Sequence, residues 1–173
     1  MRNWKKIIVI MLLFFIVSPV NAFAESTYVL PYPSSMPGSK WYLLQEWKDV
    51  VMRYWYFGNF GQFTYHVKQA DKHLVEAKTL FEYNQYYLAD QALKRSTDHF
   101  VQTASYLKQA EEEQKDISEQ KKILEQAALK HREVLDSLRE QLPETFLWQP
   151  ENAPEVVLPL YEHIDTAISK RVL

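Results

Sequence analysis

Apolar residues recur along the middle of the chain at helical spacing. They return every three or four positions from 63 to 81, and again from 89 to 107. Such spacing places each series on one stripe of a helix. The polar pair Asn84-Gln85 separates the two series. The pattern therefore predicts a helical hairpin, with helices at 62–83 and about 86–114, whose two stripes are buried against each other.

A further helix is expected before the hairpin, at 40–57. Ser39 precedes it as an N-cap, and the segment Gly58-Asn59-Phe60-Gly61, with two of the three glycines, ends it. Upstream, the stretch 25–39 holds three of the eight prolines. Proline lacks an amide donor and biases the preceding residue away from helix. We expect an extended leader that lies across the helices or is partly mobile.

Two more helices are expected after the hairpin. The carboxylate of Asp116 can accept from the Glu119 amide, which predicts a helix that starts there and stops at Pro143. A loop at 144–153 and a last helix at 154–171 complete the chain. Because no segment alternates with period two, the sequence predicts no sheet. The expected fold is all-α, an antiparallel bundle of four to five helices forming a single domain at 40–173.

The first 24 residues have the organisation of an export signal. A basic start precedes an unbroken apolar run of eleven residues at 7–17, and Ala22-Phe23-Ala24 supplies the small-x-small cleavage pattern. A membrane span needs roughly 20 apolar residues. We therefore expect a cleaved signal and a secreted or extracytoplasmic protein in the cell envelope, the alternative being an uncleaved anchor. The chain has no cysteine, so it forms no disulfides and its stability depends on packing.

Charge narrows the choice of partners. The signal contains three of the 20 basic residues and none of the 22 acidic ones, which leaves 17 basic and 22 acidic side chains after cleavage. A mildly acidic surface argues against nucleic acid or anionic membrane as the main ligand. After cleavage we expect no stable membrane insertion, and the partner is expected to be a protein. The sequence leaves a homodimer open.

Five short motifs, in this order, resemble those of an exported prokaryotic family that carries a domain of unknown function, number 5667 in that series. The resemblance spans most of the chain after the signal and implies an extracytoplasmic helical protein with no assigned activity or catalytic residues. The motifs are Leu30-Pro31-Tyr32-Pro33, Pro37-Gly38-Ser39-Lys40-Trp41-Tyr42-Leu43-Leu44, His66-x-x-x-Ala70-Asp71-x-x-Leu74-x-Glu76-Ala77, Tyr87-x-Ala89-x-x-Ala92-Leu93 and Ala128-Leu129-Lys130-His131-Arg132-Glu133-Val134-Leu135.

The histidines do not follow the usual spacing of metal ligands. His66 and His73 share one side of a helix, but two turns separate them by about 10.5 Å. Neither His-x-x-x-His nor Glu-x-x-His occurs. His131 falls on an apolar stripe, where a hydrogen-bonded interior residue is more common than a ligand. We therefore expect no metal ion and no cofactor, and treat metal or ligand binding through His66, His73, His99 or His131 as an alternative.

Signatures of catalysis are also missing. The sequence has no Gly-x-Ser-x-Gly and no phosphate-binding loop, and three glycines leave little material for either. Acidic and basic side chains close together on one helix, such as Lys72 and Glu76, are typical of a solvated helix face. We expect no catalytic residue and no enzyme activity.

Aromatic residues concentrate in and just after the helix at 40–57. Its broad apolar face is most simply explained as a core face packed in the groove of the hairpin. Four other apolar residues lie on or near the polar side and form the candidate interaction surface: Trp41, Tyr42, Met52 and Tyr56. The mixed charges of this helix argue against a membrane-binding role. The leading hypothesis is an exported, non-enzymatic protein that binds or scaffolds another envelope protein. A holdase-like chaperone and a metal- or ligand-binding bundle are the alternatives.

Overall fold

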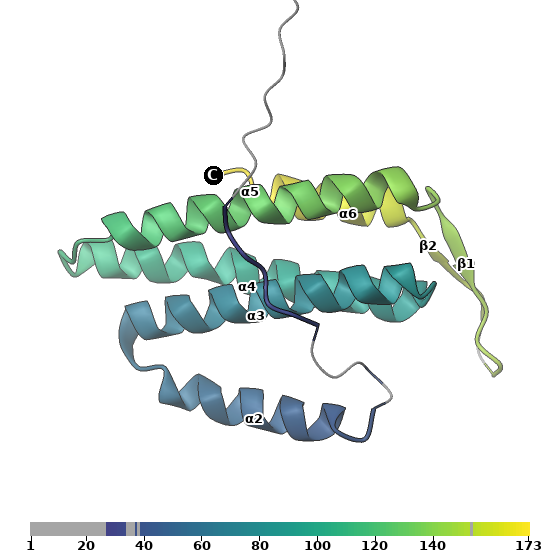
Figure 1. Cartoon of the computed structure of the whole chain (residues 1–173), viewed down its shortest axis with the longest axis horizontal. Coiled ribbons are helices and arrows are strands. Elements are labelled where there is room, and N and C mark those ends of the chain that lie inside the picture. Colours follow the sequence, from purple (N-terminus) through teal and green to yellow (C-terminus); the bar gives the residue numbers. More distant parts are fainter. Residues whose placement is uncertain (1–26, 34–36, 38, 153) are drawn as a thin grey trace, which may run out of the picture.

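The computed structural model describes residues 27–33, 37, 39–152 and 154–173. The expected export signal lies outside these residues. Within them are five helices and a two-stranded antiparallel sheet, which confirms the all-α class (Figure 1). The elements are α2 (Tyr42–Trp55), α3 (Gly58–Glu82), α4 (Tyr86–Glu112), α5 (Ser118–Gln141), β1 (Phe146–Trp148), β2 (Val156–Leu158) and α6 (Leu160–Ser169).

The hairpin of α3 and α4 is the centre of the fold, as the apolar spacing predicted. Asn84 turns the chain with a φ of 58°, a conformation that asparagine tolerates better than most residues. The helix α3 begins at Gly58, four residues earlier than expected, because the real break lies at Tyr56 and Phe57. Gly58 itself has a φ of 68°, so it supplies the turn and the first residue of α3 together.

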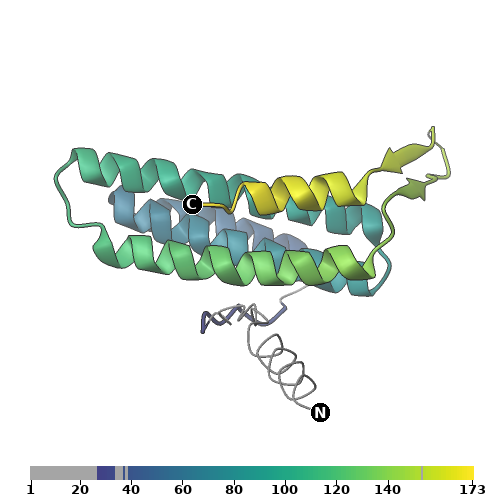
Figure 2. The ribbon, with the colours of Figure 1, turned by 90° about the horizontal axis from the view of Figure 1, so that it is seen from above.

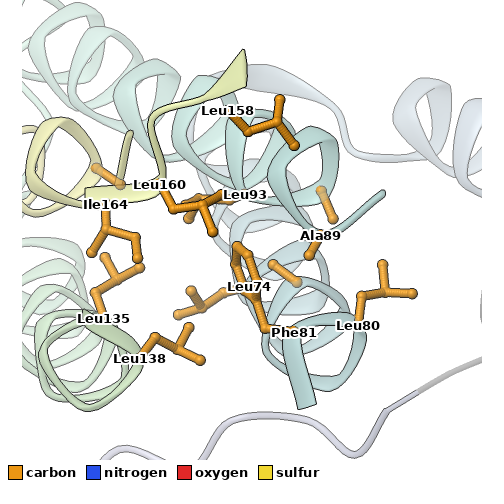
Figure 3. Close-up of a cluster of buried hydrophobic side chains, with 13 residues drawn as sticks. Leu74, Leu80, Phe81, Ala89, Leu93, Leu135, Leu138, Leu158, Leu160 and Ile164 are labelled. Atoms are coloured by element: carbon orange, nitrogen blue, oxygen red, sulfur yellow. The ribbon is translucent and has the colours of Figure 1, made fainter. Parts of the chain in front are cut away.

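Two apolar clusters form a core along the length of the bundle. The first joins α3, α4, α5 and α6 near the sheet, with Leu74, Leu135 and Ile164 fully buried (Figure 3). The second lies toward the turn between α4 and α5 and contains Phe63 and Phe100. Because apolar residues reach as far as Ala110 and Ile117, α4 and α5 remain covered almost to their connecting turn. The exposed polar tip is confined to residues 111–116.

The turn between α4 and α5 differs in detail from the expected cap. Gln114 has a φ of 58° and reverses the chain. Oδ1 of Asp116 accepts from the backbone N–H of Ser118 at 3.0 Å and from its hydroxyl at 2.6 Å, rather than from the Glu119 amide. Asp116 therefore stabilises the start of α5 through its first residue.

The end of the chain is where the expectation of no sheet was wrong. β1 and β2 pair antiparallel, with Phe146 opposite Leu158 and Trp148 opposite Val156. The Trp148 ring stacks on Tyr87 at a centroid distance of 4.0 Å, which fixes the hairpin to the start of α4. The last helix begins at Leu160 instead of 154, because the chain remains extended through β2. Figure 2 shows α6 lying along α4 and α5.

The described part of the leader crosses the helices, as expected. Leu30 packs against the first cluster and Tyr28 against the second. Figure 1 shows this segment crossing α3 before the chain reaches α2. No helix within the described ranges is both long enough and apolar enough to span a membrane.

Candidate functional site

The polar side of α2 faces α3. Three side chains of α3, spaced four apart, contact Tyr42 and Asp49 of α2 and Tyr56 just after its end, which are spaced seven apart. Because the order of partners is reversed, the two helices run antiparallel. Tyr42 donates to Glu76 at 3.2 Å, Lys68 donates to the Tyr56 hydroxyl at 2.9 Å, and Lys72 pairs with Asp49.

The connection between the helices fixes the same orientation. Nε2 of Gln62 donates to the backbone carbonyls of Tyr56 at 2.5 Å and Arg53 at 3.1 Å. At Gly61 a Cβ would lie 2.9 Å from the backbone carbonyl carbon of Tyr56, so only glycine fits this close approach. The Tyr56 ring also lies 5.9 Å from that of Tyr65 on α3. Together these contacts set which face of α2 turns inward.

The broad apolar face of α2 consequently points to solvent. Its side chains are between 57% and 82% exposed, with Trp47 at 75%. We call this set the α2 apolar face; it consists of Trp41, Leu43, Leu44, Trp47, Val50, Val51, Tyr54, Trp55 and Phe57. Exposed apolar surfaces of this size are unusual, since folded proteins bury most such side chains.

This arrangement corrects two expectations. The broad face was expected to pack in the hairpin groove, and it does not. Of the four candidate surface residues, only Trp41 is fully exposed, at 69%. Tyr42 and Tyr56 are half-buried and hydrogen-bonded to α3, and Met52 is half-buried between them. The sequence pattern predicts the two faces of α2, but it is the polar face, and not the apolar one, that packs against α3.

Three histidines converge between α3 and α4. Nδ1 of His99 lies 2.9 Å from Nδ1 of His66, so one nitrogen donates and the other accepts. The His99 ring also stacks on His73, with centroids 5.8 Å apart and planes at 14°. His99, from the other helix, thus contacts both His66 and His73, and the three rings form a cluster that the sequence spacing did not predict.

The environment of His66 and His99 favours their neutral imidazoles. Burial, together with the nearby His66, His73, Arg53 and Arg95, lowers the pKa of His99 to about 4. Burial and Arg53 also lower the pKa of His66. Nε2 of His66 is buried and has no hydrogen-bond partner among the described residues. A small hollow of about 270 Å³ opens on the pair, with Arg53 on its wall.

Glu76 forms a hydrogen bond with the third histidine of the cluster, His73. It is buried, and its Oε2 accepts from Nδ1 of His73 at 2.8 Å. Burial by itself raises the pKa of this carboxyl, but the bond from His73 and the charge of Arg95, 3.3 Å away, bring the pKa below its ordinary value. Glu76 therefore orients His73 and holds Tyr42 of α2 at the same time.

A second buried polar chain connects the leader, three helices and the C-terminal segment. The Tyr28 hydroxyl donates to Oδ2 of Asp71 at 2.6 Å, and Nε2 of His131 donates to Oδ1 at 2.7 Å. Arg171 donates to Nδ1 of His131 at 3.0 Å and to the Ser96 hydroxyl at 2.8 Å. This bears out the expectation that His131 is a hydrogen-bonded interior residue.

The described residues hold no group of three or more His, Cys, Asp or Glu placed to bind a metal ion. In the Asp71 chain each of Tyr28, Asp71, His131, Arg171 and Ser96 is hydrogen-bonded to another member, and His131 at its centre is closed off from solvent. The α2 apolar face, by contrast, is left exposed by the described part of the chain.

Comparison with known proteins bears on the domain that contains this face. A family model described as "Domain of unknown function (DUF5667)" matches residues 34–145. The chain belongs to the DUF5667 family. Neither the curated proteins nor the solved structures give a match. The DUF5667 match takes in α2 to α5 and stops before β1, so α2 is part of the family domain while Arg171 lies outside the matched span.

Proposed function

We propose that this protein is an exported, non-enzymatic scaffold of the cell envelope that binds another protein segment through the α2 apolar face. One observation carries the proposal: α2 is attached to the bundle by its polar side, which leaves its apolar side in solvent. Since burying a large aromatic or aliphatic side chain contributes about 1.5–3 kcal/mol, this outward orientation forgoes a large stabilisation unless a partner covers the face.

The size of the face fits a specific contact. Five aromatic side chains belong to it, and each can bury about 150–250 Å². With the four aliphatic side chains, and with the residues between 57% and 82% exposed, the face offers on the order of 1,000 Å². A standard protein interface buries about 800 Å² per partner. Lys48 is the charged residue set into this strip, so the matching surface is an apolar one.

The proposal can be tested by photo-crosslinking in intact cells. A photoreactive amino acid replaces Leu44 on α2 in one variant and Val101 on α4, an isolated exposed apolar residue, in the control. The expected result is one discrete crosslinked envelope protein from position 44 only, lost when Trp47→Ser is added. Equal products from both positions contradict the proposal. A broad smear of many products from position 44 favours the holdase instead.

A second candidate function rests on the histidine cluster. His66 and His99 bring two nitrogens within 2.9 Å, close to the separation of neighbouring ligands on one zinc or copper ion, and both imidazoles are held neutral as ligation requires. The nearby Arg53 and Arg95 oppose a cation, so the scaffold has the stronger support. Zinc or copper should raise the melting temperature of the tag-free protein, and His66→Gln/His99→Gln should abolish that rise while His163→Gln keeps it. No rise in the unaltered protein excludes this candidate.

A further inference from the structure

We infer that the α2 apolar face pairs with the same face of a second copy of this chain, the two α2 helices running antiparallel. This inference rests on the proposed function and names its partner. The side chains along the middle of the face are not uniform in size. Small aliphatic residues and large aromatic ones alternate along α2, and their order decides which neighbour fits.

The order of sizes is self-complementary only in the antiparallel arrangement. Along the exposed side, two leucines at 43 and 44 are followed by Trp47, then valines at 50 and 51, then Tyr54 and Trp55. A two-fold axis between 47 and 51 sets Trp47 of each copy against Val51 of the other, and the leucines against Tyr54 and Trp55. A parallel pair would instead set Trp47 against Trp47 and leave the leucines facing each other.

The position of α2 allows this approach. Figure 1 shows α2 as the outermost helix on its side of the molecule, with its axis along the bundle, so two copies can meet with their bundles on the outside. Closed two-fold dimers are the commonest symmetric assembly, and such an interface uses the same patch on both subunits. The area of the face matches what a stable dimer of this kind buries.

Two charged residues of α2 lie level with the two-fold axis. Asp49 turns inward to Lys72, so it places no acidic group in the seam. Lys48 lies at the border of the face, and its long stem can carry the ammonium into water. With the axis at 49, Lys48 of one copy lies about 3 Å along the helix from Lys48 of the other. The two ammonium groups repel each other, so both must extend outward from the seam.

Exchanging one large and one small residue tests the arrangement. The chain from Glu25 to Leu173 is studied by sedimentation equilibrium over a range of concentrations. The unaltered chain should dimerise. Trp47→Val removes the aromatic anchor from both halves, and Val51→Trp sets two large rings against each other, so each should weaken the dimer at least about 100-fold. The double variant Trp47→Val/Val51→Trp restores large against small and should return within about 10-fold of the unaltered chain. Val101→Trp, on α4, is the matched control and should leave the dimer unchanged.

Other outcomes identify a different occupant. A chain that stays monomeric overturns the inference, as does Val51→Trp dimerising as tightly as the unaltered chain. Vesicles of phosphatidylglycerol and phosphatidylcholine distinguish a lipid surface, because Val51→Trp adds an interfacial aromatic and should then strengthen binding. If the chain is monomeric but still crosslinks another protein from position 44, the self-pairing is wrong and the proposed function is still supported. If the chain neither dimerises nor forms a crosslink from position 44, both the self-pairing and the proposed function are wrong.

Discussion

Arg171 donates from Nε to Nδ1 of His131 across 3.0 Å, and this contact fixes the protonation of a buried histidine. Because Nδ1 accepts, the proton of the neutral ring is on Nε2, which donates to Asp71. Burial is the main reason that the pKa of His131 is lowered, and the charge of Arg171 adds to it. Burial likewise brings the pKa of Arg171 down to about 10. The result is a carboxylate, a neutral imidazole and a guanidinium in series, joining α3, α5 and the segment after α6.

Replacing Arg171 should destabilise the fold. Arg171→Leu leaves the Asp71 carboxylate buried without its cation and removes the donor to His131 and Ser96, which should lower the free energy of unfolding by about 3 kcal/mol. Urea denaturation measures this loss. The matched control is Arg139→Leu, which breaks an exposed pair with Asp165 and should cost less than about 1 kcal/mol. Equal losses for the two variants would show that the buried chain adds no special stability.

The stability of the fold should fall on mild acidification. His66, His99 and His131 all have a folded pKa below the ordinary value near 6.5, with His99 at about 4. The unfolded chain therefore binds more protons than the folded one between these values, so stability is complete above about pH 6.5 and declines as pH falls toward 4.

Thermal unfolding across this range measures the effect. The variant His66→Gln/His99→Gln should show a shallower slope than the unaltered chain, because two of the three contributing imidazoles are gone. A melting temperature that is constant from pH 7 to 4.5 would be inconsistent with buried neutral histidines.

The close approach at Gly61 predicts a local effect on α2. Gly61→Ala introduces a Cβ 2.9 Å from the backbone of Tyr56, which a side-chain rotation cannot relieve, so the connection must shift at a cost of about 1–3 kcal/mol. Since α2 is held by polar contacts, amide exchange should accelerate in α2 and stay slow in α3. Lys78→Ala, on a part of α3 away from these contacts, should leave α2 exchange unchanged. Faster exchange spread evenly over all helices would contradict this view of the connection.

The helices themselves could be predicted because their signals are local. The stripe from Phe63 to Phe81 lies within α3, and the turn at Asn84 and the stop at Pro143 lie in the short connections directly after helices. The hairpin β1–β2 was not predicted because strands of three residues are too short to show alternation. The helix expected at 154 gave way to β2, where Val156 pairs with Trp148, eight positions earlier, and Leu158 pairs with Phe146, twelve positions earlier.

The candidate site was harder to predict because its deciding contacts are distant in sequence. Periodicity shows that α2 has two faces, but either face can be the inner one. The choice depends on Asp49 and Lys72, 23 positions apart, and on the fit of Gly61. In the same way, the spacing of His66 and His73 does not predict the contact with His99. That residue lies on α4, 33 positions from His66.

The orientation of α2 is the claim on which the proposed function depends, and proton–proton contacts measured by NMR on the isotope-labelled chain test it directly. The account predicts cross-peaks between the rings of Tyr56 and Tyr65, whose centroids are 5.9 Å apart, and none between the Trp47 indole and any side chain of α3. A dimer adds contacts from Trp47 to Val51 of the second copy without changing that result. Cross-peaks from Trp47 to α3, with the Tyr56–Tyr65 contact missing, would contradict the account.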